Sequence, residues 1–401
     1  MGEPIPPNFQ VPGFVAAGIS AGLKKNRERD LALIYSEVPA VAAGVFTTNR
    51  VKAAPVLLSM ERVKSGTARA LLANSGSANA CTGRQGLRDG RRLSGLIASS
   101  LKILPSSVLL ASTGVIGKPL PMPMIEKNLP RLVASLSSAG LADAARAIMT
   151  TDTFPKAVIT RGRVNGREIA IAGMAKGAGM INPKMATLLS FVLTDALISP
   201  GALHQSLRDG VKRSFNRITV DGDTSTNDTL LILANGQANN RDILSHTPGY
   251  KKFSDLLHEL LFSLAKMIAR DGEGATKLVE IAVAGARTTS EAEQVARAVA
   301  HSPLVKTAFF GEDANWGRII CAAGYSGIAI DPDQVDIFFD DVPMVRRGRG
   351  TGLKNEERAT SVMKKREYKI RMNLRRGTKT ASIFTTDLSY DYVKINASYR
   401  S

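Results

Sequence analysis

The sequence predicts an α+β fold in which sheets and helices pack in layers. Short runs rich in Val, Leu and Ala, bounded by Gly, Pro or Asn, are typical of strands. Segments with apolar residues at helical spacing lie between them. Strands and helices do not alternate strictly, so a purely parallel βαβ sheet is not expected. The chain has 401 residues, 44% of them hydrophobic and 22% charged, which is enough to bury a large core without disulfide bonds.

The first half begins with strands and continues with helices. Strands are expected at Leu31–Tyr35, Val41–Thr47, Pro55–Ser59, Ala68–Asn74 and Val108–Ser112, the last ending in the turn-prone Thr113-Gly114. Helices are expected over 84–102, 122–138 and 140–148; in the first, Leu87, Leu93 and Ile97 share one face. Residues 157–172 predict a hairpin because Asn165-Gly166 is a favoured turn pair.

The second half continues the mixture. The apolar run 188–194 predicts a buried strand. Helices are expected over 200–213, 251–270 and 289–300. Further strands are expected over 229–234, 278–284, 334–340, 367–373 and 380–387. No internal repeat and no low-complexity linker interrupts these elements.

The net charge of +18 raises the question of a nucleic-acid partner. Residues 1–186 hold 24 basic and 10 acidic residues, and 346–379 hold 13 and 3. The excess is therefore spread out, and aromatic residues make up only 5% of the chain. We expect solvated surface charge and no nucleic-acid partner. No apolar stretch is long enough for a membrane span, and two distant cysteines, Cys81 and Cys321, favour a reducing cytoplasm.

Common catalytic and cofactor motifs are missing. The segment Gly114–Lys118 has the wrong spacing for a phosphate-binding loop, and Gly177–Asn182 lacks the third glycine of a dinucleotide site. The segment Asp221–Asp228 lacks the glycine and final carboxylate of a calcium loop. The histidines have no partner at metal-ligand spacing. We therefore expect neither a metal nor a bound cofactor.

The segment 176–196 remains as the place for chemistry. A Gly-rich stretch leads through Asn182-Pro183 to Met185-Ala186-Thr187 and then into an apolar run. On this local pattern alone, Thr187 would be read as the start of a buried strand. A Thr hydroxyl becomes a nucleophile only when a base accepts its proton.

Eight further blocks, together with Met-Ala-Thr, resemble the ornithine acetyltransferase (glutamate N-acetyltransferase) family along nearly the whole chain. These blocks are Val45–Asn49, Asn74–Gly83, Ser112–Gly117, Met149–Thr153, Thr219–Asp228, Arg270–Lys277, Phe310–Gly317 and Tyr392–Ala397. The resemblance implies that the chain cuts itself between Ala186 and Thr187, giving fragments 1–186 and 187–401. Thr187 then becomes an N-terminal nucleophile.

The chemistry of a new N-terminus fits this role. An α-amine has a pKa of about 8, against about 10.4 for Lys, so it serves as a base near neutral pH. The resemblance places the oxyanion hole at Thr113 and Gly114. It places the substrate pocket at Thr150, Thr151, Lys176, Thr187, Glu273, Asn396 and Ser401. A Lys suits a substrate carboxylate and a Glu suits an ammonium.

By this resemblance we expect an acetyltransferase that passes the acetyl group of N2-acetyl-L-ornithine through Thr187 to L-glutamate, in arginine biosynthesis. Acetyl-CoA is a possible second donor. The alternative is a self-processing amidohydrolase or aminopeptidase that uses water as acceptor. We expect an αββα-type sandwich shared by the two fragments, a smaller C-terminal α/β portion, assemblies of α2β2 or larger, and no membrane partner.

Overall fold

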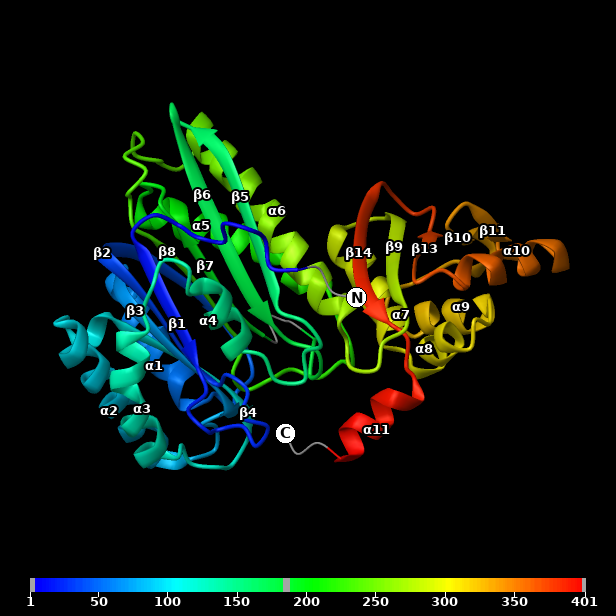
Figure 1. Ribbon diagram of the computed structural model, residues 1–401. Helices are drawn as coiled ribbons and strands as arrows, with labels where there is room; N and C mark the ends of the chain where they lie inside the picture. Colours follow the sequence, from blue (N-terminus) through cyan, green and yellow to red (C-terminus); the bar gives the residue numbers. More distant parts are fainter. Residues whose placement is uncertain (1–3, 183–187, 399–401) are drawn as a thin grey trace. The chain divides into compact units, whose positions relative to one another are not determined.

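The computed structural model describes residues 4–182 and 188–398. These residues divide into two compact units (Figure 1). Unit 1 comprises the described residues up to Asn216 together with Asp223–Ile268. Unit 2 comprises Arg217–Gly222 and the described residues from Ala269 onward.

The first part of the unit 1 sheet is built around one long strand, β2 (Leu31–Phe46). Its beginning pairs with β1 (Phe14–Ile19) on one side and with β3 (Thr67–Ser77) on the other. Strand β4 (Val108–Val115) lies parallel to β3. The register of β2 against β3 shifts between Tyr35 and Ala40, and β2 therefore continues into a second set of strands.

That second set joins the two sides of the expected cleavage point. The end of β2 pairs with β8 (Thr229–Ala234), which lies parallel to β7 (Leu189–Thr194). Strand β7 then pairs antiparallel with β6 (Arg167–Lys176), and β6 forms the hairpin with β5 (Lys156–Val164). Strands β7 and β8 thus lie between β6 and β2 in the sheet order.

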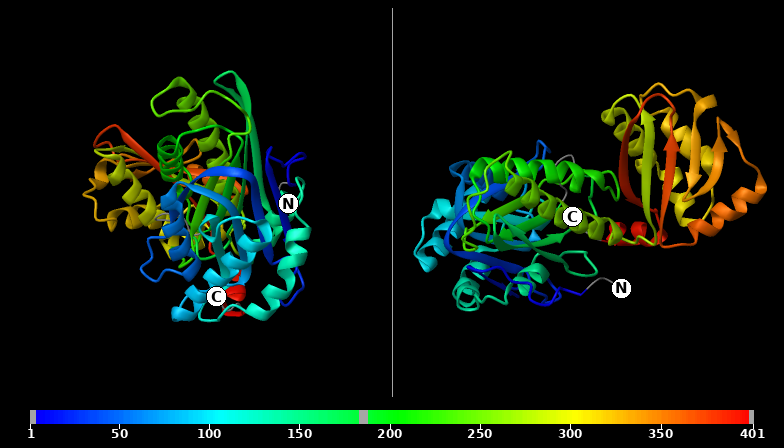
Figure 2. Two further views of the ribbon diagram at one scale, coloured as in Figure 1. Left: turned by 90° about the vertical axis from the view of Figure 1, so that its left-hand side faces the viewer. Right: turned by 90° about the horizontal axis from the view of Figure 1, so that it is seen from above.

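Unit 1 is a four-layer sandwich. Buried residues of β1, β3 and β4 share a core with buried residues of β6, β7 and β8 and with helix α4 (Leu141–Ala147). The outer face of the β1–β4 part is covered by α1 (Ala54–Arg62), α2 (Gly83–Leu101) and α3 (Met122–Ala134). Helix α6 (Pro248–Arg270) covers β5 and β6, where Leu260 lies against Gly173, and α5 (Pro200–Arg213) packs on α6. Figure 2 shows the helices outside the strands of this unit, which confirms the αββα sandwich.

Unit 2 is the expected smaller C-terminal α/β portion. Its sheet has the order β12-β11-β10-β13-β9-β14, with β9 parallel to β13. The strands are β9 (Leu278–Ala286), β10 (Asp336–Phe339), β11 (Val342–Arg346), β12 (Arg349–Gly350), β13 (Glu367–Asn373) and β14 (Lys379–Thr386). The helices are α7 (Thr289–His301), α8 (Pro303–Phe310), α9 (Trp316–Gly324), α10 (Leu353–Met363) and α11 (Tyr390–Ser398).

The structure corrects several sequence expectations. The predicted strand Pro55–Ser59 is part of helix α1, and Pro55 is the second residue of this helix. Proline is well tolerated in the first turn of a helix, because the N–H that it lacks would have no helical partner there. The predicted strands Leu31–Tyr35 and Val41–Thr47 are one strand, β2. Strands β1, β11 and β12 and helices α8 to α11 were not predicted. None of the helices in the described ranges has the length and apolar character that a membrane span requires.

Candidate functional site

Two of the predicted site residues of unit 1 are in direct contact. Lys176 is the last residue of β6, and Thr113 lies near the end of β4. The ammonium Nζ of Lys176 donates a hydrogen bond to Thr113 Oγ1 at 3.1 Å. Lys176 is only 9% exposed. The largely buried ammonium of Lys176 therefore contacts the hydroxyl of Thr113, which the resemblance assigns to the oxyanion hole.

Gly114 lies within β4, where the sequence indicated a turn. It has a φ of +126°, which side chains rarely tolerate, and a Cβ there would lie 2.5 Å from the carbonyl carbon of Gly76 on β3. The pairing of β3 with β4 is irregular next to this point, at Gly76 and Ser77. The close approach of two backbones thus requires glycine and keeps Thr113 and Gly114 in a distorted strand end.

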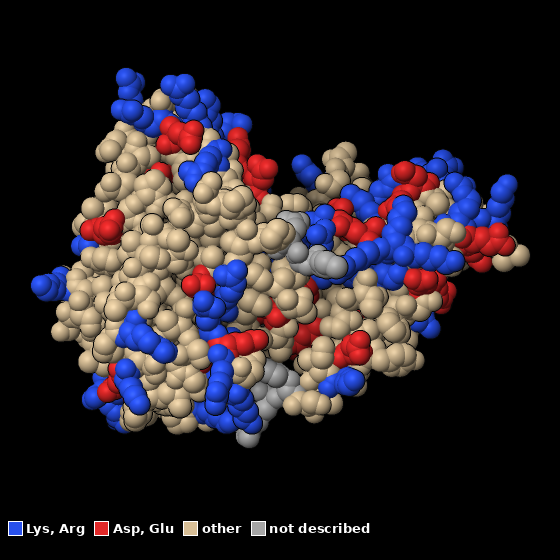
Figure 3. All heavy atoms as spheres, viewed as in Figure 1, with Lys and Arg blue, Asp and Glu red and all other residues tan. Residues whose placement is uncertain are grey.

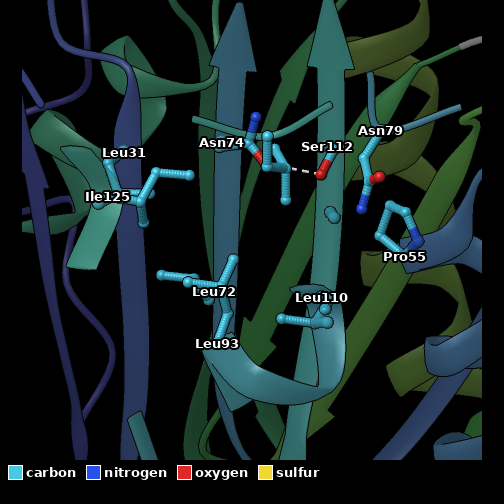
Figure 4. A pocket seen from close by; sticks show the side chains of 12 residues that line it. Leu31, Pro55, Leu72, Asn74, Asn79, Leu93, Leu110, Ser112 and Ile125 are labelled. Carbon is cyan, nitrogen blue, oxygen red and sulfur yellow. Dashed lines mark hydrogen bonds between the residues drawn. The ribbon is translucent and has the colours of Figure 1, made fainter. Parts of the chain in front are cut away.

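A buried amide network holds the strand in front of Thr113. Ser112 Oγ donates to Asn74 Oδ1 at 2.6 Å, as Figure 4 shows. The amide of Asn227 donates to the carbonyls of Ser112 at 2.8 Å and Ala78 at 2.6 Å. The cavity beside this network is only about 10 Å³, and five of its twelve lining residues are leucines. It is about the size of one water molecule, so it is not the substrate pocket.

Asp152 connects Thr150 to the end of β6. Its Oδ2 accepts the backbone N–H of Thr150 at 2.9 Å, and its Oδ1 accepts that of Gly177 at 2.7 Å. The same Oδ1 accepts from Lys156 Nζ at 2.6 Å, and both side chains of this ion pair are fully buried. Burial alone would raise the pKa of Asp152, but the Lys156 and Lys176 charges and these hydrogen bonds outweigh it and hold the pKa well below its usual range.

Asp228 is the second buried carboxyl near Lys176. It is 1% exposed, and the Thr47 hydroxyl donates to the Ser225 carbonyl at 2.8 Å. The Oδ2 of Asp228 has no hydrogen-bond partner among the described residues. Burial raises the pKa of Asp228 well above its usual range, and the charge of Lys176 opposes this only in part. The pKa of Asp228 is thus raised, whereas that of Asp152 is lowered.

Lys176 is consequently flanked by two carboxyl groups of different character. The charge of Lys176 lowers the pKa of both Asp152 and Asp228. Because Lys176 donates to Thr113 Oγ1, the hydroxyl hydrogen of Thr113 is directed elsewhere. A hydroxyl polarised in this way is a strong donor toward an oxygen that gains negative charge.

Unit 2 brings together two other predicted residues. The side-chain amide of Asn396, on α11, donates to Glu273 Oε2 at 2.8 Å and to the Tyr392 carbonyl at 3.0 Å. Glu273 is 9% exposed. Gly274, which follows it, has a φ of +65°, and a Cβ there would meet the backbone of Tyr392 at 2.4 Å. Among the described residues, the neutral amide of Asn396 is thus the donor that holds this carboxylate.

The remaining predicted residues have different outcomes. Thr150 and Thr151 are partly buried, and Thr150 reaches the Lys176 cluster only through Asp152. Ala186, Thr187 and Ser401 lie outside the described residues, so their roles stay predictions. No group of acidic, His and Cys side chains suited to a metal occurs in the parts of the chain that the structure describes. On the face drawn in Figure 3, acidic side chains are interspersed among basic ones.

Sequence reasoning missed Asp152, Asp228 and Asn227. Asp152 stands two residues after Thr150, and Asn227-Asp228 end the segment that lacks the features of a calcium loop. The available signal was their place inside the blocks Met149–Thr153 and Thr219–Asp228. Their burial and their partners depend on contacts between distant segments.

Comparison with known proteins places the chain among close relatives. A family model described as the ArgJ family matches residues 15–401. The arginine biosynthesis bifunctional protein ArgJ of Geobacter sulfurreducens is 54% identical over 393 residues, covering 98% of this chain and 100% of the relative. The protein of the same name from Syntrophotalea carbinolica is 52% identical, covering 98% and 100%. A crystal structure of arginine biosynthesis bifunctional protein argJ from Bacillus halodurans is 46% identical, covers 52% of this chain and 98% of its own, and has a TM-score of 0.50.

Proposed function

The chain belongs to the ArgJ family, and from that premise we propose that it is an acetyltransferase of arginine biosynthesis. It moves the acetyl group of N2-acetyl-L-ornithine to L-glutamate. The relatives' names support the pathway. The observation in the structure that carries the proposal is the hydrogen bond from Lys176 to Thr113 at 3.1 Å, beside two buried carboxyl groups.

The proposed maturation step creates the nucleophile. Thr187 Oγ attacks the Ala186 carbonyl carbon, the peptide C–N bond breaks, and the nitrogen of Thr187 leaves as a free amine. Water then hydrolyses the resulting ester and releases the fragment 1–186 with a terminal carboxylate. The new α-amine is the base for catalysis, because its pKa is close to neutral.

Acetyl transfer then uses the same two groups. The amine accepts the Thr187 hydroxyl proton while Oγ attacks the acetyl carbonyl of acetylornithine, and the proton passes to the leaving amine of ornithine. The amine of glutamate next attacks the acetyl ester and releases Thr187. In both steps the polarised Thr113 hydroxyl donates to the oxyanion. Removal of one such donor costs about 100-fold or more in kcat in other enzymes.

The sheet supports cleavage without separation of the fragments. Strands β7 and β8 follow position 187, and they hydrogen-bond on one side to β6 and on the other to β2, which both precede it. A cut chain would keep these ladders and the shared core. The solved Bacillus halodurans chain corresponds to about half of this chain, as expected if that protein also consists of two polypeptides. Assemblies of α2β2 or larger are proposed from the family resemblance.

Each unit offers one charged side chain for substrate recognition. In unit 1, Lys176 would attract a carboxylate. In unit 2, Glu273, held by Asn396, would suit an ammonium. Acetyl-CoA is the second proposed donor, because a ping-pong enzyme needs only to place a thioester at Thr187 and the relatives are named bifunctional.

The direct test compares Thr187→Ala with Thr187→Ser. We expect Thr187→Ala to remain one uncut chain without transferase activity, because it has no hydroxyl. Thr187→Ser keeps a hydroxyl and should be cut and active at a reduced rate. An active, uncut Thr187→Ala would overturn the mechanism.

The same assay separates the transferase from the hydrolase alternative. With acetylornithine as donor, ornithine release should rise steeply when glutamate is added, and N-acetylglutamate should appear in equal amount. Ornithine release that is independent of glutamate, with acetate as product, would instead identify an amidohydrolase.

A further inference from the structure

Unit 1 has a surface pocket of about 570 Å³ that the proposed site does not use. Four arginines from three separate segments line it. Arg27 and Arg29 lie on the loop between β1 and β2, Arg131 on α3 and Arg146 on α4. We call this feature the arginine pocket.

The arginine pocket has more positive than negative charge. Arg29 and Arg146 share one carboxylate oxygen of Asp143, at 3.1 and 3.3 Å. Arg131 donates to the carbonyl of Ser20, which carries no charge. Glu28 is the acidic residue among those that line the pocket. Four guanidinium groups thus face two carboxylates, and an anionic ligand would balance them.

The loop that carries Arg27 and Arg29 is held in place. The buried carboxylate of Asp30 accepts the backbone N–H groups of four consecutive residues, Ala21, Gly22, Leu23 and Lys24, at 2.6 to 3.1 Å. Arg29 also donates to the Gly18 carbonyl at 3.0 Å. Because the loop is ordered before any ligand arrives, a ligand would lose little affinity to ordering it.

One loop connects the arginine pocket to the Lys176 cluster. Met149 and Pro155 line the pocket. Between them, Asp152 binds the backbone of Thr150 and of Gly177. A ligand in the pocket therefore lies against the same seven-residue loop, 149–155, that positions part of the proposed substrate site.

We infer that the arginine pocket binds the phosphate-bearing nucleotide end of acetyl-CoA. A guanidinium group can donate two parallel hydrogen bonds to two oxygens of one phosphate, in a fixed geometry. Ile19, Met149 and Pro155 supply an apolar wall for a base. A small dicarboxylate or free phosphate would leave most of the pocket empty. The inference rests on the proposed function, since it gives a site to the second donor.

The experiment uses Arg27→Gln and Arg131→Gln, with Arg88→Gln as the matched control. Arg88 is exposed on α2, and within the part of the chain that the structure describes its side chain bonds to Gln85 of the same helix. The control therefore makes the same charge change away from the pocket. The KM for acetyl-CoA should rise about tenfold or more in each pocket variant, the loss expected for one hydrogen bond to a charged group. The KM for acetylornithine should stay unchanged in all variants.

Calorimetry with adenosine 3′,5′-bisphosphate, inorganic phosphate and adenosine gives a readout without activity. The bisphosphate should bind the wild-type protein and lose about tenfold in affinity in both pocket variants, while adenosine and phosphate bind far more weakly. If the bisphosphate bound all variants with equal affinity, or did not bind the wild type, the inference would be overturned. Transfer from acetylornithine by the same protein would still uphold the proposed function. Loss of transfer from both donors in the wild type would overturn the function instead.

Discussion

At the scale of single residues, the site depends on the electrostatic interactions of two buried carboxyl groups, Asp152 and Asp228, with the ammonium of Lys176. Asp152 is ionised because Lys156, Lys176 and two backbone N–H groups compensate its burial. The pKa of Asp228 is raised because burial outweighs the charge of Lys176 and the neighbouring donors. Lys176 lies near both and contacts Thr113. The two carboxyl groups therefore make opposite contributions to stability as the pH changes.

This gives a paired prediction for Asp152→Asn and Asp228→Asn. The pKa of Asp152 is lowered in the folded protein, so the ionised carboxylate stabilises the fold. Breaking its buried ion pair should cost about 3 kcal/mol in the free energy of unfolding. This contribution is full above about pH 5 and shrinks as the pH falls below about 4. The folded pKa of Asp228 is raised, so the wild type loses stability relative to Asp228→Asn as pH rises above about 4. Urea unfolding between pH 3 and pH 7 measures both, and slopes of the same sign would contradict the assignment.

Thr113 provides a second prediction at this scale. Thr113→Val removes the hydroxyl but keeps the shape of the side chain, so kcat should fall about 100-fold. The free energy of unfolding should also fall, by about 1 to 3 kcal/mol, because Lys176 loses a buried acceptor. Thr113→Ser keeps the donor and should retain most of the activity. Steady-state assays with both variants would contradict an oxyanion role if the two had equal kcat.

At the scale of elements, packing decides whether replacing a glycine in a helix by alanine raises or lowers the stability of the protein. Gly90 and Gly95 are both inside α2. A Cβ at Gly90 would lie 2.6 Å from Leu58 Cδ1 on α1, whereas a Cβ at Gly95 would meet nothing within 4 Å. Helix propensity alone favours alanine at either position by about 1 kcal/mol.

We therefore expect Gly95→Ala to raise the free energy of unfolding by about 1 kcal/mol. Gly90→Ala should gain nothing or lose stability, because Leu58 must move. Thermal or urea unfolding of the two variants, measured side by side, tests this. Equal stabilisation by both changes would show that α1 and α2 are less closely packed than the structure indicates.

The elements also show what the sequence could predict. The hairpin of β5 and β6 and strand β7 followed from an Asn-Gly turn and an apolar run. The segment Pro55–Ser59 was assigned wrongly because five residues are too few to show whether the period is 2 or 3.6. The partners of Asp152, Asp228 and Asn227 could not be predicted, since burial and hydrogen bonding between distant segments decide them.

At the scale of the whole molecule, the division into two compact units does not coincide with the expected cleavage between Ala186 and Thr187. Unit 1 includes strands from both sides of position 187, and β7 and β8 are paired on both sides with earlier strands. Cleavage would leave this core continuous. The charge is likewise a property of the surface: the excess is spread over the sequence, and acidic groups lie among the basic ones on the visible face.

The central claim is that Thr187 is a nucleophile created by cleavage and acetylated during turnover. Intact-mass measurement under denaturing conditions, after incubation with acetylornithine and no glutamate, tests it most directly. We expect two masses, for residues 1–186 and 187–401, with the second increased by one acetyl group that disappears when glutamate is added. A single full-length mass in active protein, or a second fragment that never carries the acetyl group, would contradict the account.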